Sequence, residues 1–242
     1  MNWEVPHDEP RMTNTDVVVK KQGSPSRAGA VLHHPMLYDL FVWIALRGRE
    51  RAFREKLLDL ARMSTDETVL DVGCGTGTLA IMAKRRAGSQ GSVYGVDASP
   101  KMIARARVKA RRGGIGAQFF PATAQALPFP GAMFDVVFST IMLHHLGRTS
   151  RRRLAEEMRR VVKPTGRVLV VEFARSTRRS LSFHANYQPR HGHVAPQDVE
   201  QLLRDAGFDI VDSGAVAVRD MHFVLASPRQ GPAEHAMQPD DG

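Results

Sequence analysis

Val69-Leu70-Asp71-Val72-Gly73-Cys74-Gly75-Thr76-Gly77 is the stretch of this sequence that decides the fold. The apolar run Thr68–Val72 is typical of a short buried strand, and a helix is expected from about Thr78 to Ala87. Glycines between a strand and a helix let the backbone turn sharply and come close to a ligand. The helix N-terminus that follows carries positive potential, which suits a carboxylate or a phosphate. The stretch therefore indicates a ligand-binding loop in an α/β fold.

Strands and helices alternate on both sides of this loop. Strands are predicted at 92–97, 117–121, 134–139, 167–173, 208–213 and 219–226, and helices at 35–62 (divided near Gly48), 99–111, 151–162 and 196–206. Strands that are nearly all apolar favour a mostly parallel sheet covered on both faces. The last two strands are joined by a short loop, which favours an antiparallel hairpin at the sheet edge.

Length and composition favour one domain between two tails. The chain has 242 residues, of which 43% are hydrophobic, enough for one sizeable core. Residues 1–30 and 228–242 lack hydrophobic periodicity and are expected to be mobile tails around a domain at 31–227. No membrane span or secretory leader is expected. The single cysteine, Cys74, excludes an internal disulfide and favours the cytoplasm.

The net charge of +9 leaves several kinds of partner open. Such a balance is typical of proteins that bind nucleic acid, anionic membrane or acidic substrates, and also of an ordinary solvated surface. The basic clusters are spread over several helices, on faces expected to be exposed, and no RNA-binding module is recognisable. Nucleic acid is therefore a less favoured partner, and the sequence does not indicate the oligomeric state.

Two acids distinguish the loop from a pyrophosphate-binding one. Asp97 ends the strand after the loop, where an acid can accept two hydrogen bonds from ribose hydroxyls. The loop reads G-x-G-x-G, whereas the dinucleotide fingerprint is G-x-G-x-x-G. Asp71, just before the first glycine, would repel a pyrophosphate but suits the ammonium group of a methionine moiety. Taken singly, these residues fit any α/β fold; together they favour a cofactor site.

Six segments in this order are similar to the class I S-adenosylmethionine-dependent methyltransferases, and most of all to the group that includes the ubiquinone and menaquinone C-methyltransferases. The resemblance covers about residues 35–226 and implies a Rossmann-like, doubly wound, seven-stranded sheet with a reversed edge strand and N-terminal helices. The segments are 69–77, 94–102, 126–129, 134–135, 143–146 and 163–166.

The resemblance implies S-adenosyl-L-methionine as the cofactor and assigns residues to it. The loop glycines would pass under the methionyl part, Asp97 would hold the ribose, and Ala98 and Met102 would flank the adenine. Thr123 stands where the family has an acid that contacts the adenine amino group, so weaker adenine recognition is expected. The full set of predicted cofactor residues is Asp71, Gly73, Gly75, Gly77, Asp97, Ala98, Met102, Thr123, Ala124, Gln125 and Ser139.

Methyl transfer from a sulfonium mainly requires alignment of the acceptor, and an acceptor with an acidic proton also benefits from a base. Histidine is the usual base near neutral pH. His144 follows the fourth predicted strand, at the edge where α/β sheets bind ligands, and His184 and His193 lie in the 174–195 connection. The resemblance implies that this connection and the N-terminal helices cover the acceptor as a lid. No histidine has a clear set of metal-ligating partners, so no metal is expected.

The sequence therefore predicts an enzyme that methylates a small, partly apolar metabolite by in-line displacement. Two alternatives stay open. The basic charge leaves methylation of RNA, and Thr123 leaves a non-catalytic domain that binds S-adenosylmethionine for a partner.

Overall fold

The computed structural model describes residues 50–173, 194–216 and 221–230. The expected N-terminal tail, residues 231–242 of the expected C-terminal tail, the first half of the 35–62 helical segment and most of the 174–195 lid lie outside the described residues. Pro228, expected to begin the C-terminal tail, is instead the last residue of the final strand. The elements, in chain order, are α2 (Glu50–Leu60), β1 (Thr68–Val72), α3 (Thr78–Ala87), β2 (Ser92–Asp97), α4 (Pro100–Arg112), β3 (Gln118–Pro121), β4 (Phe134–Thr140), a 3-10 turn (Leu143–His145), α5 (Arg148–Val161), β5 (Val162–Phe173), α6 (Pro196–Asp205), β6 (Phe208–Val216) and β7 (Met221–Pro228).

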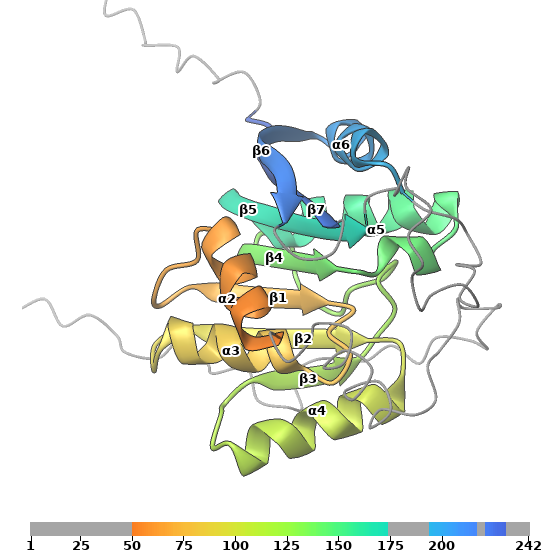
Figure 1. Cartoon of the computed structure of the whole chain (residues 1–242). Helices are drawn as coiled ribbons and strands as arrows, with labels where there is room; N and C mark the ends of the chain where they lie inside the picture. The colour runs from red at the N-terminus through yellow and green to blue at the C-terminus, as the bar shows by residue number, and fades with distance from the viewer. Residues whose placement is uncertain (1–49, 174–193, 217–220, 231–242) are drawn as a thin grey trace, which may run out of the picture.

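The strands form a seven-stranded sheet in the order β3-β2-β1-β4-β5-β7-β6 (Figure 1). All pairs from β3 to β5 are parallel, whereas β7 runs antiparallel to both β5 and β6. The predicted edge hairpin is thus confirmed, with the reversed strand β7 second from the edge and β6 outermost. The chain reverses its winding between β1 and β4, and ligands of doubly wound sheets bind at such a switch point.

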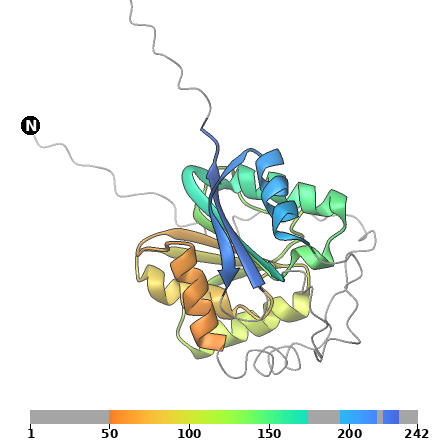
Figure 2. The same cartoon turned by 45° about the horizontal axis from the view of Figure 1, so that its top comes forward.

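Helices cover both faces of the sheet, as the apolar strands predicted. Buried side chains of α2, α3 and α4 pack on one face, and those of α5 and α6 pack on the other. Figure 2 shows the sheet between these two groups of helices. Because successive side chains of a strand point to opposite faces, each central strand contributes to both cores. Because β1, β2, β4 and β5 run parallel, their carboxyl ends share one edge of the sheet, and the loops at this edge can form a site.

Two elements begin three or more residues before the predicted position. α5 begins at Arg148, three residues earlier than expected, after Gly147 in extended conformation. β5 begins at Val162 because this residue already pairs with Phe134, and the register then shifts before Val136 pairs with Arg167. A Cβ on Gly166 would lie 2.8 Å from the carbonyl oxygen of Phe134. Close packing at the irregularity therefore requires glycine there.

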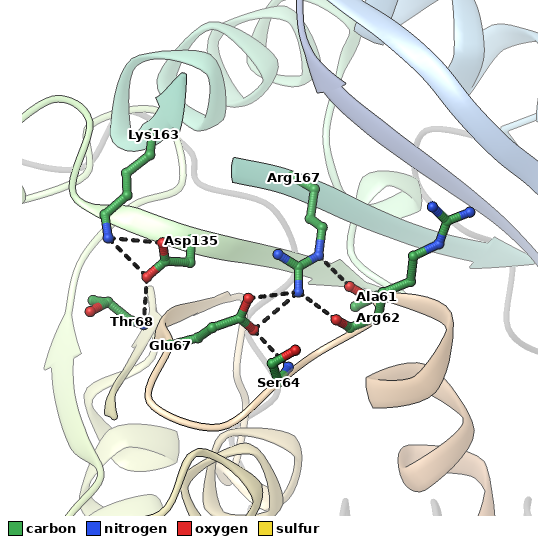
Figure 3. Close-up of polar contacts among 8 residues, drawn as sticks. All are labelled: Ala61, Arg62, Ser64, Glu67, Thr68, Asp135, Lys163 and Arg167. Carbon is green, nitrogen blue, oxygen red and sulfur yellow. Dashed lines mark hydrogen bonds and ion pairs between the residues drawn. The ribbon is translucent and has the colours of Figure 1, made fainter. Parts of the chain in front are cut away.

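Ionic contacts tie the strands together at the opposite edge, where β1 and β4 begin (Figure 3). Lys163 pairs with Asp135 at 2.8 Å, and Asp135 accepts the backbone N–H of Thr68 at 2.8 Å. Arg167 pairs with Glu67 and donates to the carbonyl oxygens of the two residues after α2, Ala61 and Arg62, at 2.5 and 2.6 Å. This network fixes the approach of α2 to β1 and leaves the carboxyl edge to the site.

Candidate active site at the carboxyl edge of the sheet

The glycine loop has a backbone that only glycine adopts without strain. Gly73, Gly75 and Gly77 have φ values of 76°, 53° and 77°, in the left-handed region that disfavours side chains. A Cβ on Gly73 would lie 2.5 Å from Sδ of Met142, and one on Gly77 would lie 2.7 Å from the ring of Phe119. The loop is therefore packed closely against Met142 and Phe119, and larger side chains than glycine do not fit at positions 73 and 77.

Asp97 connects the loop to the end of β2. Its Oδ2 accepts the N–H of Gly75 at 3.0 Å, and its Oδ1 accepts the N–H of Ser99 at 2.8 Å. Ser99, not Asp97, caps α4, because its hydroxyl accepts the N–H of Met102 at 3.4 Å. Burial raises the pKa of Asp97, and the two backbone donors oppose this rise. A carboxylate has further lone pairs for ribose hydroxyls, so the arrangement fits the role expected of Asp97.

Asp71 lies at the end of β1 with its side chain buried between the sheet and α3. It is 2% exposed, and its Oδ1 has no hydrogen-bond partner among the described residues. Burial raises the pKa of Asp71 to about 7, and the nearby Arg54 of α2 opposes this rise. A buried carboxylate oxygen without a donor is costly. A ligand with a cationic amine would supply the missing donor.

The predicted adenine side lies next to Asp97. The N–H of Ala122 donates to the carbonyl of Asp97 at 3.1 Å and so holds the segment Thr123–Gln125 beside the end of β2. Ala98 is exposed and Met102 is buried at the start of α4. The structure thus brings these residues to one side of the loop.

Lys109 of α4 contacts the glycine loop, although no motif in the sequence pointed to this residue. Its ammonium donates to the hydroxyls of Thr76 at 3.0 Å and Thr78 at 2.7 Å. These hydroxyls flank Gly77, the residue at the N-cap of α3. A lysine on the next helix therefore holds the loop from the outside, which no local motif would reveal.

The segment after β4 crosses from the glycine loop toward β5. Ile141 has a φ of 55°, rare for a β-branched residue, and its N–H donates to the carbonyl of Val171 in β5 at 2.8 Å. The turn directs Met142 against Gly73. Ser139, which pairs with Val72 of β1, is 1% exposed, and its hydroxyl has no partner among the described residues. Strain of this kind is common at functional sites.

His144 lies at the end of this segment against a carboxylate of β5. Its Nδ1 is 2.7 Å from Oε1 of Glu172, and its backbone N–H donates to Oε2 at 3.3 Å. Both side chains are buried, with exposed fractions of 7% and 1%. The sequence pattern indicated His144 but not Glu172. The available signal was a single acid directly after the apolar run 168–171, as Asp71 directly follows Val69 and Leu70.

Other predicted residues do not join this arrangement. His184 and His193 lie outside the described residues. Among the residues the structure describes, no group of three or more potential metal ligands is found, and no helix is long and apolar enough to cross a membrane. Burial and the acids Asp71 and Asp97 raise the pKa of the Cys74 thiol, so Cys74 is a poor nucleophile.

Comparisons with known proteins agree with the fold and the loop. A family model described as a methyltransferase domain matches residues 69–166. The demethylmenaquinone methyltransferase of Thermus thermophilus is 38% identical over 136 residues, which are 56% of this chain and 60% of the relative. The ubiquinone/menaquinone biosynthesis C-methyltransferase UbiE of Pectobacterium atrosepticum is 31% identical over 172 residues, which cover 70% and 67% of the two chains.

Solved structures show the same fold at lower identity. A S-adenosylmethionine-dependent methyltransferase from Aquifex aeolicus superposes with a TM-score of 0.67 at 23% identity, over 81% of this chain and 98% of its own. The [4+2]-cyclase SpnF superposes with a TM-score of 0.62 at 22% identity, over 74% and 81%. SpnF is named as a cyclase and not as a methyltransferase, so the fold alone does not determine the reaction.

The sheet order and the glycine loop define the class I methyltransferase architecture. The chain belongs to the S-adenosylmethionine-dependent methyltransferases, in the group that contains the ubiquinone and menaquinone C-methyltransferases. Its cofactor is S-adenosylmethionine. The site fits that molecule in two respects: an unpartnered buried oxygen on Asp71 and the carboxylate of Asp97 at the end of β2.

Proposed function

We propose that this chain transfers the methyl group of S-adenosylmethionine to a ring carbon of a small quinol that carries an apolar tail. The names of the two curated relatives support this acceptor class. When bound, S-adenosylmethionine supplies an electrophilic methyl group on a sulfonium. The residues of the chain bind the cofactor and the acceptor, align them and exclude water. Alignment can lower the activation free energy by on the order of 7–11 kcal/mol in favourable cases.

One observation carries the assignment of an acceptor position. Met142 packs on Gly73 of the cofactor loop, and two residues later His144 contacts Glu172 at the end of β5. The acceptor side therefore adjoins the methionyl side of the loop. The ring of Phe173 lies 5.6 Å from that of His144 and offers an apolar contact beside the charged pair. An aromatic neighbour of this kind suits a quinol ring.

Contacts within the chain support a small acceptor over RNA. Arg86 pairs with Glu55 and Asp59, and Arg160 pairs with Glu157. Arg159 donates to the carbonyl of Gly207 at 3.2 Å. Among the described residues, these three arginines already hold acids or carbonyls and are less available to a phosphate backbone. The single cysteine supports the cytoplasm as the compartment.

The test is a transfer assay with radiolabelled S-adenosylmethionine and three acceptors: a prenylated naphthoquinol, a catechol and total transfer RNA. We expect label in the naphthoquinol, and mass spectrometry should place the methyl on a ring carbon. The Asp97→Ala variant is the control for transfer outside the site. Label in RNA would replace the proposal with RNA methylation. Binding of S-adenosylmethionine without transfer to any acceptor would favour a non-catalytic domain.

A further inference from the structure

The carboxylate of Glu172 is surrounded by donors from two segments. Oε1 accepts the N–H of Phe173 at 3.0 Å and lies 2.7 Å from Nδ1 of His144, while Oε2 accepts the backbone N–H of His144 at 3.3 Å. A carboxylate with acceptor sites on both oxygens can satisfy all of these contacts. Since an ionised carboxylate only accepts, Nδ1 must carry the proton in this contact, and Nε2 then carries the lone pair.

We propose that Glu172 is a positioning residue that holds His144 as the general base for the hydroxyl proton of the methyl acceptor. This inference rests on the proposed function and specifies an acceptor with an acidic hydroxyl, such as a quinol or an enol. His144 is anchored at its side chain and its backbone by one carboxylate. The strained turn at Ile141 and the packing of Met142 on Gly73 fix the same segment relative to the cofactor loop.

The balance of the step is simple. The hydroxyl proton of the acceptor passes to Nε2 of His144, and the resulting oxyanion supplies the electron pair for the new carbon–carbon bond. The sulfur–methyl bond breaks and its electron pair stays on sulfur as a neutral thioether. The ring carbon then loses its hydrogen as a proton, and the oxygen regains one, so that one proton is released in total. Glu172 stays ionised and stabilises the imidazolium.

Other charged groups face this pair from the neighbouring elements. Arg151 of α5 donates to the carbonyl of Leu143 at 2.8 Å and interacts with both Glu172 and Asp198 of α6. His222 of β7 pairs in register with Glu172. Burial lowers the pKa of His222, an effect that Glu172 and Glu200 oppose. His145 lies beside the pair, with its ring 4.0 Å from that of His144.

His222 provides an internal contrast. It is next to the same carboxylate, yet neither of its ring nitrogens has a hydrogen-bond partner among the described residues. His222 is therefore a buried neutral side chain, whereas His144 is the one oriented by a carboxylate. The distinction between the two comes from contact geometry and not from proximity to charge.

The first experiment reads the protonation state without any acceptor. The chain contains 10 histidines, so protein labelled with nitrogen-15 histidine is compared with the His144→Asn variant to assign the His144 signals. We expect the Nδ1–H form wherever the ring of His144 is neutral in the full chain. The Nε2–H form would overturn the proposal, whether or not a methyl acceptor has been found.

The second experiment measures kinetics in Glu172→Gln. Glutamine keeps the shape but removes the charge and one acceptor oxygen, so we expect kcat to fall roughly 100-fold, within the range for general bases. The affinity for S-adenosylmethionine and the KM of the acceptor should stay within a factor of about three. The acidic limb of the kcat profile should move to lower pH.

The matched control is Glu200→Gln in α6, which should retain the wild-type rate and pH profile. Glu172→Asp should recover part of the lost rate. An unchanged kcat and pH profile in Glu172→Gln would overturn the proposal. Absence of transfer by the wild-type chain would contradict the proposed function instead, and the nitrogen-15 result would stand apart from it.

Discussion

Asp97 and Gly75 form one unit, because the carboxylate that ends β2 accepts the N–H of the central loop glycine at 3.0 Å. Asp97→Ala should remove this contact together with the acceptor for ribose. We expect the affinity for S-adenosylmethionine to fall roughly 100-fold, since hydrogen bonds to a charged group contribute about 1.5–3 kcal/mol. Titration calorimetry measures the loss. Asp209→Asn, an exposed acid of β6 paired with Arg229, is the control, and equal affinities in both variants would contradict the assignment.

Gly73 and Met142 are in a contact that leaves no space for a methyl group. Gly73→Ala should destabilise the fold by about 1–2 kcal/mol for the left-handed backbone and by about 1–3 kcal/mol more for the overlap. Gly114→Ala is the control, because Gly114 also has a positive φ, 61°, and has open space around it. Urea unfolding should show the larger loss at Gly73, and Met142→Ala should restore part of it. Equal losses at the two glycines would contradict close packing at the loop.

The sequence predicted the strands and the glycine loop because their signals are local. Thr68–Val72, Thr78–Ala87 and Ser92–Asp97 have the predicted bounds, since apolar runs and glycines fix where these elements begin and end. The pairing of His144 with Glu172 is a different matter. The two residues are 28 positions apart and meet only because β4 and β5 are neighbours.

Local patterns also failed where strand pairing decides a boundary. Pro164 and Gly166 favour a turn at 163–166, whereas β5 begins at Val162 through its pairing with Phe134. The contact of Lys109 with Thr76 and Thr78 likewise joins α4 to the glycine loop and to the first residue of α3, and no local pattern predicts it. Contacts between distant segments thus account for what the sequence left open.

Asp71 should make both stability and cofactor binding depend on pH. Burial raises its pKa to about 7 from an ordinary 3.8, so the folded chain binds the proton more tightly than the unfolded chain. Stability should therefore fall as pH rises from about 4 to about 7, by an amount on the order of 4 kcal/mol. Urea unfolding across this range should show a flatter dependence for Asp71→Asn.

The ionised form of Asp71 attracts the ammonium group of S-adenosylmethionine. The affinity of the wild-type chain should therefore rise through pH 7 more steeply than that of Asp71→Asn. Comparing the two proteins removes the titration of the ligand itself. Parallel curves in calorimetry would mean that Asp71 does not contact the cofactor.

Arg167 is expected to be important for stability and not for activity. Arg167→Met leaves two backbone carbonyls and Glu67 without their donor (Figure 3). The free energy of unfolding should fall by about 2–3 kcal/mol, because acceptors that are partly buried lose a charged partner. Arg152→Met removes an ion pair that is 69% and 57% exposed and should cost less than about 0.5 kcal/mol. Comparable losses would refute the role of the network.

Thr123 stands where the family pattern has an acid, and restoring the acid tests whether this position contacts the adenine. The segment is held beside Asp97 through Ala122, so an acid at 123 would stand next to the predicted adenine position. Thr123→Asp should strengthen binding of S-adenosylhomocysteine about tenfold, because a charge-assisted hydrogen bond is roughly twice as strong as a neutral one. The gain should disappear for the analogue with hypoxanthine in place of adenine, which lacks the amino donor. Thr123→Asn is the uncharged control. Equal gains for both bases would place adenine away from residue 123.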